Sequence, residues 1–289
     1  MRFEKWQALG NDYLIVERDQ LPFELTAKRI RLLCDGHYGA FADGVLLLSP
    51  PADASDVADL RIFNPDGSEA ELSGNGAREA IMYLRSRGWT DEDSFSIHTA
   101  AGRIRPRILD HERCRVDMGN ASLSSKDYPT GAANGRGTVE SAGRAWSFQH
   151  VSIGNPQCAI AVSTLDELEQ LDLPGIGPAI EAAAQFPNRT NVSWYAELEP
   201  EPARIRARIF ERGVGETLSS GTGASGAAIA YAIATGIPSE GLTVVVQLDG
   251  GELEVEVTAN LHVNLTGWAR PVYAGELSTA FEKELNETE

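Results

Sequence analysis

Apolar and polar residues alternate through most of this chain, and that period is typical of half-buried β-strands. Helical spacing occurs in a short segment, residues 25–35, and in two longer ones, residues 75–86 and 223–234. Residues 125–143 resemble a loop, and the closing residues 282–289 a frayed tail. The strands expected from alternation and short apolar runs are residues 2–17 (ending at 14–16), 44–48, 58–63, 94–108, 114–118, 148–153, 158–163, 191–198, 203–210, 242–248, 252–258 and 261–266.

Part of the pattern occurs twice. Residues 61–77 (RIFNPDGSEAELSGNGA) align without a gap to residues 208–224 (RIFERGVGETLSSGTGA) at an offset of 147, with 8 of 17 positions identical. Upstream, Leu-Gly-Asn-Asp at 9–12 aligns with Ile-Gly-Asn-Pro at 153–156 at an offset of 144. The chain is therefore expected to contain two copies of one domain, each with a Gly-Asn loop, a strand, a Ser-Gly-x-Gly-Ala turn and one principal helix.

These patterns predict an α+β fold of two pseudo-symmetric halves without the strict strand–helix alternation of a doubly wound sheet. A length of 289 residues suits two domains of ordinary size. We place their boundary near residue 120, with halves at 1–120 and 121–289. The segment of about 267–282 is a candidate for returning to the first half.

The composition and charge of the chain restrict the classes of partner that it is expected to bind. A formal net charge of −17 disfavours nucleic acid and anionic membranes, because the long-range field repels phosphates. It says little about small ligands, since one local arginine outweighs that field at contact distance. Three scattered cysteines offer no disulfide framework, and no membrane span or secretory apolar segment is apparent. We expect a cytoplasmic protein.

The two Ser-Gly-x-Gly-Ala turns carry the candidate chemistry. Each lies between a strand and a helix, where glycines direct backbone N–H groups at one point and the helix start favours an anion. One such turn is an ordinary serine N-cap; two at equal offset suit reactions on two opposite faces of one substrate atom. Residues 221–226 also match G-x-G-x-x-G, but the surroundings do not suggest a βαβ unit, so a dinucleotide site is disfavoured. The dispersed histidines and cysteines predict no metal site.

Five segments together resemble the diaminopimelate epimerase family, over nearly the whole chain. They are ALGNDY (8–13), FNPDGSEAELSGNGAR (63–78), GNP (154–156), TNV (190–192) and ERGVGETLSSGTGAS (211–225). The resemblance implies two similar halves, each a β-roll around a central helix, in a chain that usually forms a homodimer. It also implies a cofactor-independent isomerase that inverts one α-carbon of LL-diaminopimelate to give the meso form, for lysine and peptidoglycan synthesis.

The same resemblance implies a set of residues that bind a zwitterionic amino acid. Glu211 and Arg212 match the pair that reaches the amino and carboxylate groups, and an arginine can bind a carboxylate through two hydrogen bonds. Asparagines hydrogen-bond a zwitterion without adding charge. The matching asparagines and helix starts are Asn11, Asn64, Asn155, Asn191, Gly74, Asn75, Gly221 and Thr222.

The sequence departs from the family at the chemistry. The family has a catalytic cysteine in each turn, whereas this chain has Ser73 and Ser220 at those positions. The family also has a histidine directly after GNP, where this chain has Gln157. A thiol titrates near 8.5, but a serine hydroxyl is several units more basic, and each unit costs about 1.36 kcal/mol. A helix start supplies only about 0.3–2 kcal/mol. Unless a neighbour activates a serine, with Glu211 the best candidate, the rate is low or the reaction is different.

Three explanations for the serine pair stay open. The chain is a natural divergent isomerase that uses other groups or another amino or carboxylic acid; or a binding protein that has kept the pocket and lost the chemistry; or a chain whose two cysteines were replaced deliberately to trap a ligand. The last explanation fits the survival of Cys34, Cys114 and Cys158 but leaves Gln157 unexplained.

Overall fold

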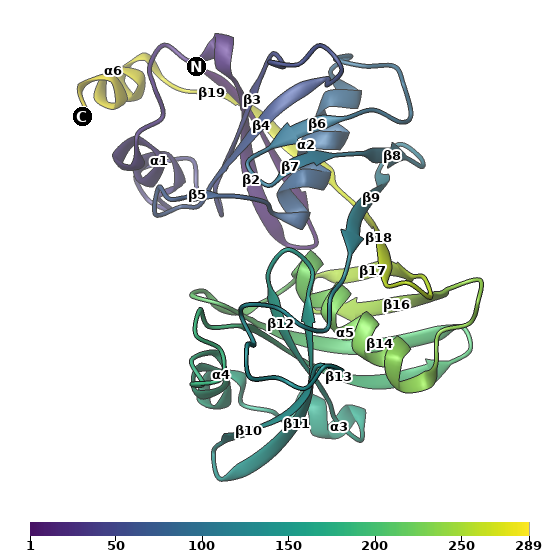
Figure 1. Ribbon diagram of the computed structural model, residues 1–289. Helices are drawn as coiled ribbons and strands as arrows, with labels where there is room; N and C mark the ends of the chain where they lie inside the picture. The colour runs from purple at the N-terminus through teal and green to yellow at the C-terminus, as the bar shows by residue number, and fades with distance from the viewer. Residues whose placement is uncertain (289) are drawn as a thin grey trace. The chain divides into compact units, whose positions relative to one another are not determined.

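The computed structural model describes residues 1–288, which divide into two compact units. Unit 1 contains Met1–Val116 together with the chain from Gly267 onward, and unit 2 is Asp117–Thr266. Strands β9 (Arg113–Asn120) and β18 (His262–Trp268) carry the chain across the division (Figure 1). The C-terminal segment therefore belongs to the same unit as the N-terminus.

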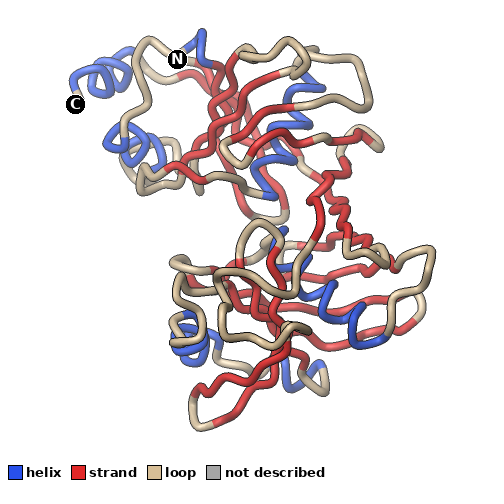
Figure 2. The backbone as a smooth tube through the Cα atoms, in the orientation of Figure 1, coloured by secondary structure: helices blue, strands red, loops and turns tan. Residues whose placement is uncertain are grey.

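Unit 1 is a mixed sheet with one helix buried against it. The strand order is β19-β1-β2-β3-β4-β6-β7, with β5 beside β4. Helix α2 packs against β1, β2 and β3, and Figure 2 shows the helix beside the strands of this sheet. Residues 75–84 of this helix are all buried. The elements of this unit are β1 (Arg2–Ala8), β2 (Asn11–Glu17), α1 (Ala27–Cys34), β3 (Val45–Ser49), β4 (Ala58–Phe63), β5 (Glu69–Ala70), α2 (Gly74–Ser86), β6 (Ile97–Thr99), β7 (Gly102–Ile104), β8 (Pro106–Ile108), β19 (Arg270–Glu276) and α6 (Thr279–Glu287).

Unit 2 repeats this arrangement with a larger sheet. The order runs β10-β11-β12-β13-β14-β16-β17-β18-β9-β8, with β15 beside β14. Strands β11–β14, β16 and β17 all contact helix α5, which is made largely of alanine and glycine and is buried from Gly223 to Ala232. Its elements are β10 (Arg136–Ser141), β11 (Arg144–Ser152), β12 (Pro156–Ala161), α3 (Leu165–Glu169), α4 (Leu173–Glu181), β13 (Asn191–Pro200), β14 (Ala203–Glu211), β15 (Gly215–Thr217), α5 (Gly221–Thr235), β16 (Leu242–Leu248) and β17 (Gly251–Val257).

Each central helix is a crossover between parallel strands. Strand β4 pairs parallel with β6 around α2, and β14 pairs parallel with β16 around α5. The expectation that no βαβ unit surrounds residues 221–226 was therefore wrong. The third glycine of that pattern has a packing reason, since a Cβ on Gly226 would lie 2.8 Å from Cβ of Gln157. Close approach of α5 to β12 requires glycine there.

Three local predictions need correction. The expected strand at residues 94–108 is broken into β6, β7 and β8, because Gly102 turns the chain at φ +108°. The expected loop at 125–143 contains β10, which forms a hairpin with β11 through Ala142 and Gly143, both at positive φ. The tail is not frayed through residues 282–287, because α6 buries Leu285 in the unit 1 core and Ser278 caps its start.

The two helices have different side chains at equivalent positions, although each of these side chains satisfies the carbonyl of the first helical residue. In α2, Nη1 of the fully buried Arg78 donates to the Gly74 carbonyl at 2.9 Å; in α5, Ser225 Oγ donates to the Gly221 carbonyl at 2.8 Å. Glu79, the next residue of α2, is also fully buried. At these two positions α2 therefore carries a fully buried arginine and a fully buried carboxylic acid, whereas α5 has Ser225 and Gly226.

Burial raises the pKa of Glu79 well above its ordinary value of 4.5; Arg78 lowers this pKa, whereas Asp12 and Asp43 raise it further. The folded state thus keeps this proton at pH values where the unfolded chain has lost it, so the free energy of unfolding falls as pH rises through that window. We expect Glu79→Gln to have a higher melting temperature than the parent at about pH 8 and a smaller advantage at about pH 5.

Thermal unfolding across this pH range provides the measurement. Glu71→Gln, at an exposed position just before the same helix, serves as the matched control and should follow the parent at every pH. A Glu79→Gln protein whose melting temperature runs parallel to that of the parent would show that this carboxyl does not titrate on unfolding.

Candidate active site

Ser73 caps helix α2 of unit 1. Its backbone is extended, and its Oγ accepts a hydrogen bond from the N–H of Gly76 at 3.1 Å. Because the cap satisfies the third N–H of the helix, the first two, of Gly74 and Asn75, are left to other acceptors. The phenol of Tyr13, on β2, donates to the same Oγ at 3.3 Å. Ser73 is itself half-buried.

A chain of hydrogen bonds fixes two of the expected substrate-binding asparagines. Nη2 of Arg78 donates to Oδ1 of Asn75 at 2.6 Å, and Nδ2 of Asn75 donates to Oδ1 of Asn11 at 3.3 Å. Nδ2 of Asn11 then donates to a carboxylate oxygen of Asp43 at 2.8 Å. Charged groups at both ends therefore determine which way each amide points.

Asn64 lies apart from that chain. It follows β4 in a tight loop, and its Nδ2 donates to Ser68 Oγ at 3.0 Å. Within residues 1–288 this side chain has no hydrogen bond to Asn11 or Asn75 in the structure. The structure thus joins Asn11 and Asn75 by a hydrogen bond, whereas Asn64 is bonded within its own loop.

Ser220 occupies the equivalent place in unit 2, at the start of α5, and it is buried. Its Oγ accepts from the N–H of Gly223 at 3.2 Å. Burial raises the pKa of the Glu211 carboxyl, while hydrogen bonds from Thr217 and Ser220 lower it. The Thr217 hydroxyl is 2.8 Å from that carboxylate. The candidate activator predicted from the sequence therefore lies in hydrogen-bond contact with one of the two serines.

Asn155 and Thr222 are joined directly, since Nδ2 of Asn155 donates to Thr222 Oγ1 at 3.2 Å. The fully buried Gln157 donates from Nε2 to Oδ1 of Asn155 at 2.7 Å. Gln157 also packs against Gly226 of α5. This glutamine holds Asn155 in one orientation.

Arg212 and Asn191 meet through the backbone of the loop after β14. The N–H of Arg212 donates to Oδ1 of Asn191 at 2.9 Å, and Asn191 donates to the carbonyl of Pro156 at 3.1 Å. The exposed guanidinium of Arg212 contacts the Asn188 carbonyl at 3.0 Å. No carboxylate within residues 1–288 forms an ion pair with it, because Glu216 pairs with Arg208 instead.

Sequence reasoning missed three residues of unit 1 that contact the expected site: Tyr13, Asp43 and Arg78. Two of them stand inside the motifs already identified, Tyr13 in ALGNDY and Arg78 at the end of SGNGAR. Asp43 had no signal in the sequence, because only the parallel pairing of β2 with β3 brings it to Asn11.

The three cysteines offer no substitute for the missing thiols. Cys34, Cys114 and Cys158 are all buried and unbridged. Burial raises the pKa of Cys34 and of Cys114 to about 12 and that of Cys158 well above its ordinary value. A thiol of this kind holds its proton at neutral pH and packs as a small apolar group.

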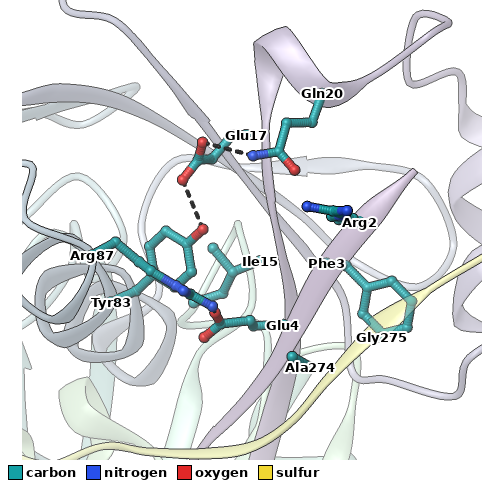
Figure 3. A pocket seen from close by; sticks show the side chains of 10 residues that line it. All are labelled: Arg2, Phe3, Glu4, Ile15, Glu17, Gln20, Tyr83, Arg87, Ala274 and Gly275. Carbon is teal, nitrogen blue, oxygen red and sulfur yellow. Dashed lines mark hydrogen bonds and ion pairs between the residues drawn. The ribbon is translucent and has the colours of Figure 1, made fainter.

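A cavity of about 220 Å³ in unit 1 lies away from Ser73, at the C-terminal end of α2 (Figure 3). Its charged groups are already paired. Glu17 accepts from Tyr83 and Gln20, and Glu4 forms an ion pair with Arg87. Residues 1–288 also contain no group of three or more metal-ligating side chains placed to hold an ion, and no helix among them is long and apolar enough to span a membrane.

Comparison with known proteins gives consistent results. The family model described as diaminopimelate epimerase matches residues 3–124 and 149–272. A diaminopimelate epimerase of Synechococcus sp. (strain JA-3-3Ab) is 38% identical over 283 residues, which cover 95% of this chain and 97% of the relative. One from Pelotomaculum thermopropionicum is 38% identical over 288 residues, covering 96% and 98%.

Solved structures share the fold at low identity. A hydroxyproline epimerase from Agrobacterium vitis, solved with bound trans-4-hydroxy-L-proline, superposes with a TM-score of 0.65 at 17% identity, covering 95% of this chain and 91% of that one. A probable proline racemase from Agrobacterium radiobacter K84 gives 0.67 at 15% identity, covering 99% and 95%. The two-unit α+β architecture is that of this group of isomerases.

Proposed function

This chain belongs to the diaminopimelate epimerase family, and from that premise we propose that it inverts one α-carbon of diaminopimelate, between the LL and meso forms, with no cofactor taking part. The observation that carries the proposal is the pair of serine-capped helix starts. Ser73 and Ser220 hold the same place at the N-termini of equivalent helices. Such starts favour a carboxylate, because N–H groups and the helix dipole converge there.

We assign substrate binding to the polar groups around each start. Asn11 and Asn75 in unit 1, and Asn155 and Asn191 in unit 2, have their amides oriented by neighbouring groups, which suits recognition of a zwitterion. Asn64 is added from the family pattern alone. Gln157 is an amide and exchanges no proton at neutral pH, so we assign it to the positioning of Asn155.

We propose that the two serines address opposite faces of the α-carbon, one removing the proton and the other replacing it. Serine is a poorer proton carrier than cysteine, so each hydroxyl needs help from a neighbour. Glu211 provides a carboxylate beside Ser220. The product would feed lysine and peptidoglycan synthesis, and we place the activity in the cytoplasm, where amino acids are made.

The direct test is exchange of the α-hydrogen of diaminopimelate in deuterated water. We expect the purified parent protein to incorporate deuterium and to interconvert the LL and meso isomers. The double variant Ser73→Cys with Ser220→Cys should be faster by a factor of about 10 or more, because a thiol titrates closer to neutral pH and suits both halves of the exchange.

Contrary results would separate the alternatives. A parent that binds diaminopimelate in calorimetry yet shows no exchange would favour a binding protein. Exchange with a different amino acid, and none with diaminopimelate, would show that the substrate is that other amino acid. A double variant that folds and binds but is no faster would show that proton transfer does not pass through positions 73 and 220.

Arg212 is proposed to hold a substrate carboxylate, because its guanidinium has no carboxylate partner within residues 1–288. We expect Arg212→Ala to weaken diaminopimelate binding by about 30-fold or more, since losing one member of a desolvated charge pair costs about 2–5 kcal/mol. The melting temperature should barely change, because the exposed side chain makes one backbone contact.

Calorimetric titration and thermal unfolding measure the two quantities separately. Arg189→Ala is the matched control, since Arg189 is also exposed and is already ion-paired with Glu181. Unchanged affinity together with a large loss of melting temperature in Arg212→Ala would assign this arginine to its own loop instead.

We also propose a homodimer formed through strand β19. This strand ends the order of the unit 1 sheet, and it exposes Val272 and Tyr273 to 53% and 44%. An exposed edge of this kind readily pairs with another chain. Antiparallel pairing of two copies about Tyr273 would set Arg270 of one opposite Glu276 of the other, so the strand is complementary to itself.

Sedimentation equilibrium tests the dimer. The parent should be dimeric at micromolar concentration, and Val272→Lys should be monomeric because charge on an edge strand blocks pairing. Leu165→Lys places the same charge at an exposed leucine of unit 2 and should leave the dimer intact. A monomeric parent, or a dimeric Val272→Lys, would contradict this interface.

A further inference from the structure

We propose that Tyr13 is a positioning residue that supplies, and takes back, the proton which Ser73 exchanges with the substrate. The inference rests on the proposed epimerase function and deepens it at one of its two turns. Tyr13 does not touch the α-carbon in this proposal, because it acts through the Ser73 hydroxyl.

The first support is the hydrogen-bond capacity of Ser73. A hydroxyl has two acceptor lone pairs and one proton. The lone pairs of Ser73 Oγ are engaged by the N–H of Gly76 at 3.1 Å and by the phenol of Tyr13 at 3.3 Å. The proton of Ser73 must therefore point away from both donors. This arrangement makes Ser73 a donor toward an anion bound at the start of α2.

Ser220 is arranged in the opposite sense. Its Oγ also accepts from the helix, through Gly223, but its own proton is directed to the Glu211 carboxylate, which can only accept when ionised. One lone pair of Ser220 is left for a proton from elsewhere. The two equivalent serines thus have different partners. Ser73 accepts a hydrogen bond from a phenol, whereas Ser220 donates one to a carboxylate.

The position of the phenol is tightly constrained. Tyr13 is 5% exposed, and its ring lies against the backbone of Gly44. A Cβ at Gly44 would lie 2.6 Å from Cε1 of Tyr13 and 2.2 Å from the carbonyl oxygen of Phe63. Because only glycine fits there, the packing of β3 against β2 holds the phenol at Ser73.

The proton transfer balances without another reactant. When the α-carbanion is protonated, the Ser73 O–H bond breaks and a C–H bond forms, while the Tyr13 proton moves to Ser73 Oγ. The negative charge passes from the carbanion to the phenolate oxygen. In the reverse direction the phenolate takes the Ser73 proton as Oγ receives the α-proton. A phenol is far more acidic than an alcohol, so the charge rests on a group that can hold it.

The test is Tyr13→Phe, which removes one oxygen and keeps the ring against Gly44. We expect kcat for diaminopimelate epimerisation to fall by about 100-fold, the lower range for a positioned acid or base, with KM changed less than about twofold. Tyr83→Phe is the matched control. Tyr83 is a buried tyrosine of the same unit whose phenol bonds Glu17, and kcat should stay at the parent level.

A double-mutant cycle separates proton supply from a structural role. In the Ser73→Cys background the thiol reaches its anion without a phenol, so adding Tyr13→Phe should lower kcat by less than about fivefold. A structural role would give the same loss in both backgrounds, and that result would overturn the inference.

The outcomes also distinguish the inference from the function on which it rests. An active parent with an equally active Tyr13→Phe would overturn the inference and leave the epimerase function standing. An inactive parent with an active Ser73→Cys/Ser220→Cys protein would overturn the inference by showing that the hydroxyl pair transfers no proton. Inactivity of both proteins on diaminopimelate would overturn the proposed function and the inference with it.

Discussion

The structure depends on burying the starts of two helices inside sheets. A buried helix start has N–H groups that must find acceptors, and a serine cap satisfies one of them in each unit, at Gly76 and at Gly223. The cap fixes the serine hydroxyl, and glycine is needed beside it because the sheet lies in contact. The requirement that makes the fold possible therefore places a hydroxyl beside the first N–H groups of each helix.

Divergence of the two copies gave the two helix starts different hydrogen-bond partners. In α2 the carbonyl of the first helical residue is satisfied by Arg78, whose second nitrogen orients Asn75, whereas α5 uses the small Ser225 for the same carbonyl. The arginine occupies space inside unit 1, and the next residue of the helix, Glu79, is a fully buried carboxylic acid. The alanine-rich α5 instead packs closely on its sheet through Gly226.

A serine in place of each family cysteine alters what the surroundings must do for the proposed proton transfer. A cysteine needs a modest environmental shift to become a thiolate, so the helix start is nearly sufficient. A serine needs a partner that accepts or gives the proton in the same step. Ser220 has Glu211 and Ser73 has Tyr13, whereas the cysteines that remain are buried in the cores with raised pKa values.

The sequence alone determined the duplication, the two central helices and the serines at their starts. These features depend on short-range physics: glycine and serine at a cap, an apolar face at helical period, and identity between residues 61–77 and 208–224. Most strands were placed for the same reason. The hairpin at β10, the break at Gly102 and helix α6 were not, because turn geometry and the burial of Leu285 decided them.

Only the tertiary structure decided the partners of the site residues. Tyr13 meets Ser73 across 60 positions, and Asn11 meets Asp43 across 32. Strand pairing and the crossover of α2 set these contacts, and neither has a local signature in the chain. The site side chains can be recognised from their motifs, but the hydrogen-bond partner of each one depends on which strand lies beside it.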